Sequence, residues 1–215
     1  MGESPERVRE LVVEAVDAAA ELVGRPIVAE RWNEPSALDG MTVGALAAHT
    51  LRAAGSTIAY LDRSDPEASS DGERLTAVTY FHAAVDSPIH ERIKEVSADE
   101  SSIGPQETAA RFAALVDDLR ARLAAEPTDR AIGALGGRSI SLDDFCRTRL
   151  IEVLMHLDDL AASVGEEPRP TSPESIGIVV EILFGIARNL RGDWTVMRAL
   201  GRAERLEGGP VFPVF

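Results

Sequence analysis

The sequence is poor in cysteine, in aromatic residues and in positive charge, and each shortage excludes a class of protein. Cys146 is the only cysteine among 215 residues, so the chain cannot form an internal disulfide, as is typical of proteins in reducing compartments. Aromatic residues make up only 5% of the chain, which favours helix over sheet. The 22 Lys and Arg residues face 36 Asp and Glu, and the resulting net charge of −14 repels phosphate backbones. We therefore expect no nucleic-acid partner.

Long hydrophobic runs are also absent. No run approaches the roughly 20 apolar residues that span a bilayer, and no segment has the pattern of a secretory signal. We expect a cytoplasmic protein with no membrane partner. What is present is an ordinary globular composition, 45% apolar and 27% charged, in a chain long enough for one domain and a modest extension.

Capping residues and helix breakers divide the chain into helices. Ser4-Pro5 is a helix start, Gly24 and Pro26 mark its end, and Pro88 splits a later helical segment into two pieces. The complete set of predicted helices is Pro5 to Gly24, Thr42 to about Asp62, two pieces between Glu73 and Val96, Pro105 to Pro127, Ser141 to Gly165, Ser172 to Leu190, and Trp194 to Arg205.

These helices predict an all-α fold, a bundle of four principal helices with a C-terminal helical extension. We place the bundle at residues 1–168 and the extension, packed on it, at 169–215. Trp32 and Trp194 are expected to pack between the two parts. A short hairpin is predicted around Gly136-Gly137. The apolar segment Ile176 to Leu190 needs cover, so the protein is expected to be a monomer or a homodimer.

Candidate chemistry is concentrated in the predicted helix that follows Ser141. Glu152 and His156 are four residues apart, so their side chains stack on one helical face and can bind a single ion. A catalytic zinc ion typically takes three protein ligands, and the third candidate is His49, which has small neighbours on its own helical face. Cys146 points into the apolar stripe of its helix and is interpreted as a packed core thiol.

The spacing leaves other interpretations open. Glu152 could pair with Arg149 on the surface while both histidines are merely partly buried. His82, Asp86 and His90 form a second candidate ligand set, although Pro88 interrupts their helix. Arg52 and Arg149 could bind a substrate carboxylate or simply be solvated, and Asp159 is either a partner that orients a ligand or an exposed acid.

Two segments resemble one known family. The stretch from Trp32 to His49 and the run from Arg149 to His156 are similar, in the same order, to the ligand segments of mycothiol-dependent maleylpyruvate isomerases, whose N-terminal domain is a DinB-like four-helix bundle. The resemblance covers about residues 5–165. It implies a divalent ion, zinc first, on His49, Glu152 and His156, with a position left for water or a low-molecular-weight thiol such as mycothiol.

Three functions remain open. The resemblance implies a metal- and thiol-dependent transferase or isomerase, in which an activated thiol adds to an electrophilic small-molecule substrate. The isomerases have a further α/β domain, whereas residues after 170 here are predicted to be helical, which argues against maleylpyruvate itself as the substrate. The alternatives are a structural or sensory metal site and a metal-free helical interaction module.

Overall fold

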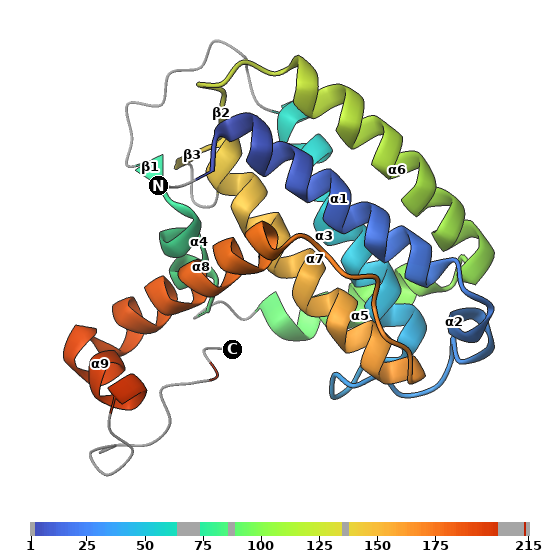
Figure 1. Ribbon diagram of the computed structural model, residues 1–215. Helices are drawn as coiled ribbons and strands as arrows, with labels where there is room; N and C mark the ends of the chain where they lie inside the picture. Colours follow the sequence, from blue (N-terminus) through green and yellow to red (C-terminus); the bar gives the residue numbers. More distant parts are fainter. Residues whose placement is uncertain (1–2, 64–73, 86–88, 135–137, 202–212, 214–215) are drawn as a thin grey trace.

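Four long helices form the body of the protein. The computed structural model describes residues 3–63, 74–85, 89–134, 138–201 and 213. The bundle helices are α1 (Pro5–Val23), α3 (Val43–Arg63), α6 (Pro105–Ala125) and α7 (Leu142–Val164). Both α1 and α3 contact both α6 and α7, so the four helices enclose one core (Figure 1). The predicted all-α, four-helix architecture is confirmed.

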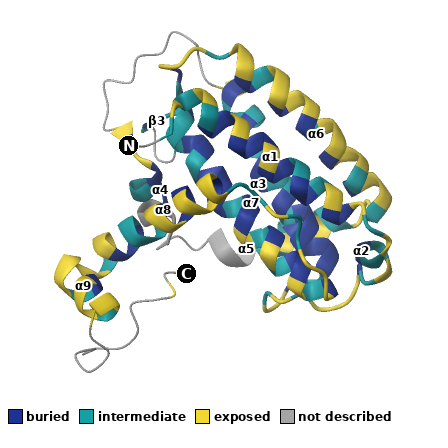
Figure 2. Cartoon of the chain, in the orientation of Figure 1, coloured by how far each residue is buried: buried dark blue, intermediate teal, exposed yellow. Residues whose placement is uncertain are grey.

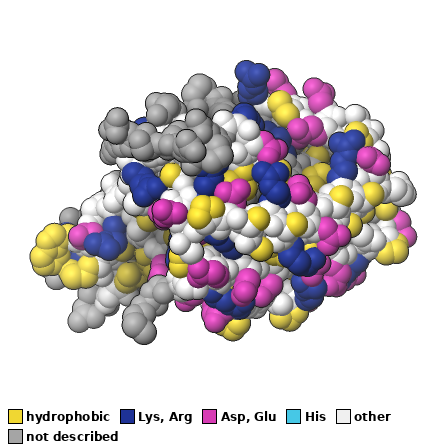
Figure 3. Space-filling model, turned by 90° about the horizontal axis from the view of Figure 1, so that it is seen from above, with side chains coloured by type: hydrophobic (Ala, Val, Ile, Leu, Met, Phe, Trp, Pro, Cys, Tyr) yellow, Lys and Arg dark blue, Asp and Glu magenta, His cyan; other side chains and the backbone are white. Residues whose placement is uncertain are grey.

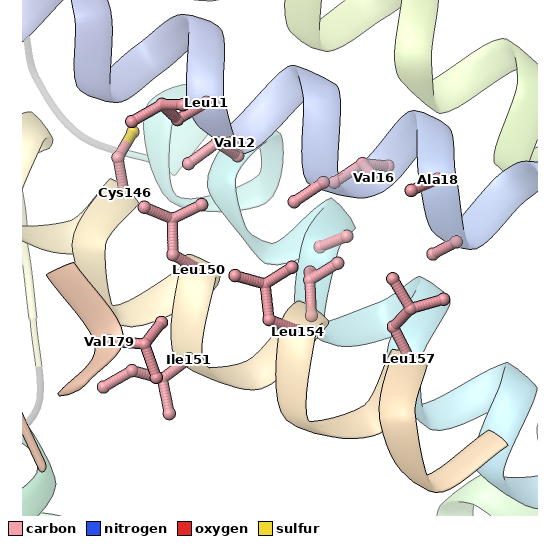
Figure 4. Close-up of a cluster of buried hydrophobic side chains, with 14 of the residues drawn as sticks. Leu11, Val12, Val16, Ala18, Cys146, Leu150, Ile151, Leu154, Leu157 and Val179 are labelled. Carbon is pink, nitrogen blue, oxygen red and sulfur yellow. The ribbon is translucent and has the colours of Figure 1, made fainter. Parts of the chain in front are cut away.

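The core lies between the inward faces of these helices. In Figure 2 the buried residues line the inner faces, while the outer side of α6 is exposed. Figure 4 shows the α1–α7 contact, where Leu11, Val12 and Val16 face Cys146, Leu150 and Leu157. All six side chains are at most 3% exposed. The regular helical spacing of apolar residues in both segments therefore buries one continuous stripe, and α7 is fixed along its whole length.

Further helices surround the bundle. They are α2 (Pro26–Glu30), α4 (Ala77–Val85), α5 (Ile89–Ser101), α8 (Pro173–Arg191) and α9 (Asp193–Gly201). Helix α5 packs on α3, and α8 packs on α4 and α7, with α9 at its far end (Figure 1). The two helical pieces predicted on either side of Pro88 are α4 and α5. Residues 202–205, predicted to complete the last helix, lie outside the described part of the chain.

A small three-stranded sheet caps one end of α7. Its strands β1 (Arg74–Leu75), β2 (Ala131–Gly133) and β3 (Ser139–Ser141) have the order β1-β3-β2. Strands β2 and β3 pair antiparallel, with Ile132 opposite Ile140, as the hairpin prediction requires, although Gly136-Gly137 itself lies outside the described residues. Strand β1, parallel to β3, was not predicted, and the expected helix begins at Ala77 rather than near Glu73. Residues 74 and 75 form a strand because they pair with a strand 65 residues away in the sequence, and no local sequence pattern indicates this pairing.

Caps fix where the two site-bearing helices begin and end. Ser141 Oγ accepts a hydrogen bond from the Asp144 amide at 3.0 Å and donates one to the Asp144 carboxylate at 2.9 Å. Gly165 ends α7 in the left-handed conformation, with φ of 71°. At the start of α3, Thr42 Oγ1 accepts from the Ala45 amide at 3.1 Å. The predicted caps at Thr42, Ser141 and Gly165 are confirmed.

The surface is charged on the bundle and apolar on α9. Figure 3 shows acidic and basic side chains interspersed over the bundle and hydrophobic side chains gathered at the end where α9 lies. Trp194 is 70% exposed, so the prediction that it packs the extension against the bundle is wrong. It lies on a short helix that contacts α8, and Arg198 stacks on its ring. Among the described helices, none is long and apolar enough to cross a membrane.

Trp32 packs within the bundle, over the start of α3. Its indole Nε1 donates to the Ser101 carbonyl at 3.2 Å, and its ring lies so close to Gly44 that a Cβ on Gly44 would be 2.5 Å from Trp32 Cε2. Gly44→Ala is therefore expected to displace the indole and to lower the free energy of unfolding by about 1–3 kcal/mol. Denaturant unfolding measures this change.

The matched control is Gly55→Ala in the same helix. A Cβ there would meet Leu115 at an ordinary 3.8 Å, so this variant is expected to be neutral or slightly stabilising. If Gly44→Ala unfolds at the same denaturant concentration as Gly55→Ala, the close approach of Trp32 does not constrain the helix start.

Candidate metal centre

Helices α3 and α7 bring His49, Glu152 and His156 together. The Glu152 carboxylate oxygen Oε2 lies 3.8 Å from His49 Nε2 and 3.6 Å from His156 Nε2. One ligand atom from each residue falls within 4.8 Å of the others, and the two imidazole rings meet edge to face with centroids 4.7 Å apart. Their side chains are 13%, 24% and 17% exposed, respectively. The cluster is thus largely but not completely withdrawn from water.

Asp159 stands behind His156. Its Oδ2 lies 3.2 Å from His156 Nδ1, the ring nitrogen that faces away from Glu152. A hydrogen bond from Nδ1–H to a carboxylate fixes the ring orientation and leaves the Nε2 lone pair for an ion. Of the two interpretations considered from the sequence, the structure supports the partner that orients His156. The spacing of three residues from His156 on one helix is the sequence signal for this contact.

Arg52 contacts the other histidine, His49, through its guanidinium. Its Nη2 donates to His49 Nδ1 at 3.0 Å and also contacts Ser97 Oγ at 3.0 Å, while its Nε lies 3.1 Å from Glu100 Oε2 without hydrogen-bond alignment. Because a guanidinium can only donate, Nδ1 of His49 must accept, and the proton of neutral His49 is on Nε2. An ion at Nε2 requires that proton to move to Nδ1 and Arg52 to turn away from the ring.

Burial and hydrogen bonding set opposite charge states for the two histidines. Burial lowers the pKa of His49 below its ordinary value, so His49 is neutral at pH 7. Burial also opposes protonation of His156, but its hydrogen bonds to Asp159 and Glu152 outweigh this and raise its pKa to about 9. Burial alone would raise the pKa of Glu152. The hydrogen bonds from His156 and His49 and the positive charge of Arg149 outweigh burial, so the pKa of Glu152 lies well below its ordinary value. The metal-free cluster therefore holds one imidazolium between two carboxylates.

The remaining sequence candidates have other roles. Glu152 does not pair with Arg149 on the surface, because Arg149 is buried and donates to Thr148, Ala53 and Ser56. Cys146 is fully buried, and burial raises the pKa of its thiol to about 12, which confirms a packed core thiol. Of the alternative ligand set, Asp86 and the side chains of His82 and His90 lie outside the described residues.

Above about pH 9, where a proton on His156 no longer competes with the ion, Asp159→Asn is expected to weaken zinc binding by about 10–100-fold, because an amide is a poorer acceptor for His156 Nδ1–H than a carboxylate. Competition with a chromophoric chelator measures the affinity. The control is Asp158→Asn, the exposed neighbour, which makes the same change in net charge outside the cluster. Equal losses in both variants would mean that only long-range charge is at work.

Comparison with known protein families finds a match over most of the chain. The family model described as mycothiol maleylpyruvate isomerase N-terminal domain matches residues 7–161. The match spans α1 to most of α7 and includes His49, Glu152, His156 and Asp159. No curated protein and no solved structure matches the chain.

Proposed function

The chain belongs to the mycothiol maleylpyruvate isomerase N-terminal domain family, and from that premise we propose that it is a metal-dependent enzyme that uses a low-molecular-weight thiol of the mycothiol type. It acts as a transferase or isomerase on an electrophilic small molecule. The observation that carries the proposal is the convergence of His49, Glu152 and His156, with Asp159 behind His156.

The donor set suits a divalent ion such as zinc. Two imidazoles and one carboxylate are a ligand combination of catalytic zinc, which leaves one coordination position for water or substrate. Glu152 is ionised and lies between both Nε2 atoms, and Asp159 holds His156 in the orientation that an ion needs. His49 fits once Arg52 has turned toward Ser97 and Glu100, which it already contacts.

The chain's own residues define what the site can do. A bound divalent ion would supply Lewis acidity that lowers the pKa of a thiol. Glu152 adds negative charge that limits the net positive charge of the site, and Asp159 keeps the proton of His156 on Nδ1, away from the ion. In an isomerase, a thiol that adds to a conjugated double bond leaves again after rotation, whereas in a transferase the adduct is the product.

The test is thiol binding to the cobalt-substituted protein. Mycothiol titrated into the Co²⁺-loaded protein is expected to produce a sulfur-to-cobalt absorption band, and S-methylated mycothiol is the control that must not. Cobalt binding without a thiol band would instead favour a structural or sensory ion. Failure to bind cobalt or zinc at all would leave the metal-free interaction module.

A further inference from the structure

Arg149 is a buried cation without a carboxylate partner among the residues that the structure describes. It lies on α7 one turn before Glu152 and is only 5% exposed. Within the described residues, two other arginines are as deeply buried, and each has an acid: Arg9 lies 2.9 Å from Asp143, and Arg130 lies 3.0 Å from Glu126. Buried charges are normally paired because withdrawing them from water is costly. Arg149 therefore departs from the pattern of its own protein.

Uncharged groups hold the Arg149 guanidinium in place. Nε donates to Thr148 Oγ1 at 3.1 Å, and Nη1 donates to Ser56 Oγ at 3.2 Å and to the Ala53 carbonyl at 3.3 Å. The guanidinium carbon lies 4.7 Å from the centre of the Phe145 ring. Nη2 makes no hydrogen bond to the described residues, and unlike Arg52 Nε it is not sealed from solvent. The plane of the group is thus fixed, and one of its donors is left for a ligand.

Arg52, the other arginine considered from the sequence, is the weaker candidate. Its side chain is 34% exposed, its Nε faces Glu100, and its Nη2 is engaged with His49 and Ser97. An anion would have to compete with a carboxylate already in place. Arg149 has no such competitor among the described residues.

The contact between α3 and α7 places Arg149 beside the candidate metal centre. His49 on α3 faces Glu152 on α7. Arg149 lies one turn before Glu152 on α7, and it faces Ala53 and Ser56, which lie one and two turns after His49 on α3. The charge of Arg149 is close enough to favour the ionised form of Glu152. A small molecule bound at the cluster would therefore lie within electrostatic reach of this guanidinium.

We propose that Arg149 is an anion-binding residue that receives the carboxylate of a small organic ligand beside the His49–Glu152–His156 cluster. Taking this ligand to be the electrophilic substrate rests on the proposed function, but anion binding at Arg149 requires no metal ion. A planar carboxylate matches the in-plane donors of a guanidinium. The guanidinium of Arg149 also packs against the Phe145 and Tyr80 rings, which lie side by side.

Acetate binding to the metal-free protein tests this inference. The Arg149 Nε–Hε signal is followed by NMR while sodium acetate replaces sodium chloride at constant ionic strength, with acetamide as the uncharged control. Acetate is expected to shift the signal in a saturable way and to raise the melting temperature, and acetamide is expected to do neither. No response to acetate, or an equal response to acetamide, overturns the proposal.

Variants separate ligand binding from a structural role. Arg149→Met is expected to weaken acetate binding about 10-fold or more while leaving the melting temperature unchanged or higher, because an unpaired buried charge is replaced by an apolar chain. Arg147→Met, two residues away, where the guanidinium donates to the Glu3 carbonyl, is expected to bind acetate as the parent does. If Arg149→Met is strongly destabilised yet still responds to acetate, Arg149 is only structural.

Two further measurements keep the result interpretable. Arg149→Lys keeps the positive charge but loses the planar set of guanidinium donors, so it is expected to bind acetate several-fold more weakly than the parent. This variant also tests the proposal if Arg149→Met does not fold. Equal acetate binding by Arg149→Lys and the parent contradicts the proposal. Zinc affinity is measured separately on the same proteins. If the protein binds acetate but not zinc, the proposed function is overturned and the anion site is retained. If it binds zinc but not acetate, the anion site is overturned and the proposed function is retained.

Discussion

His156→Ala is expected to reduce zinc binding by more than 100-fold, whereas the parent protein binds close to one zinc ion per chain. The variant removes one of the three ligands of the proposed centre, so its effect should exceed the roughly 10–100-fold loss typical of an outer-shell partner. Metal content is measured by elemental mass spectrometry on protein purified without a metal-affinity column, and affinity is measured by chelator competition.

The control for this variant is Met155→Ala, at the neighbouring position of α7. Met155 is 42% exposed and is not part of the cluster, so its truncation should leave zinc binding unchanged. If the parent and the His156→Ala protein both contain no metal and neither binds added zinc, the protein is not a metalloenzyme. A metal-free helical interaction module is then the favoured function.

Zinc affinity is expected to rise roughly tenfold per pH unit from pH 6.5 to about 9 and then to level off. In the metal-free protein the hydrogen bonds to Asp159 and Glu152 overcome burial and raise the pKa of His156 to about 9, so a proton must leave before Nε2 can bind an ion. Burial keeps His49 neutral in this range, so it adds no second proton. Chelator competition across the pH range, corrected for protonation of the chelator, measures the slope.

Asp159→Asn supplies the internal control for this pH dependence. Without the carboxylate, the pKa of His156 should move toward its ordinary value near 6.5, and the rise in affinity should end at a lower pH. A parent affinity that does not change between pH 6.5 and 9 would mean either that His156 is unprotonated in the free protein or that it is not a ligand.

Local sequence signals predicted most of the helical framework. Ser4, Ser141 and Gly165 mark helix ends because capping and left-handed turns depend only on residues a few positions apart. The pairing of Glu152 with His156 was predictable for the same reason, since the α-helix itself sets the geometry of residues four apart. Strand β1 was missed because its partner, β3, lies far away in the sequence.

Contacts between helices decided the rest of the site. The sequence offered Arg52 and Arg149 as equal candidates for binding an anion, and it could not distinguish an Asp159 that orients a ligand from an exposed acid. The packing of α3 against α7 and α5 separated the two arginines, because it brings Glu100 to Arg52 and leaves Arg149 without an acid among the described residues. The role of Asp159 was decided within α7, by its contact with His156.

By itself, the sequence determined the helical fold class, the spacing of the candidate ligands on α7 and, through resemblance, the choice of His49. Only the tertiary structure decided the charge state of each histidine and which of the two candidate arginines has no carboxylate partner among the described residues. The physical reason is that helix geometry and capping are local, whereas burial and ionic contacts depend on which side chains two distant helices bring face to face.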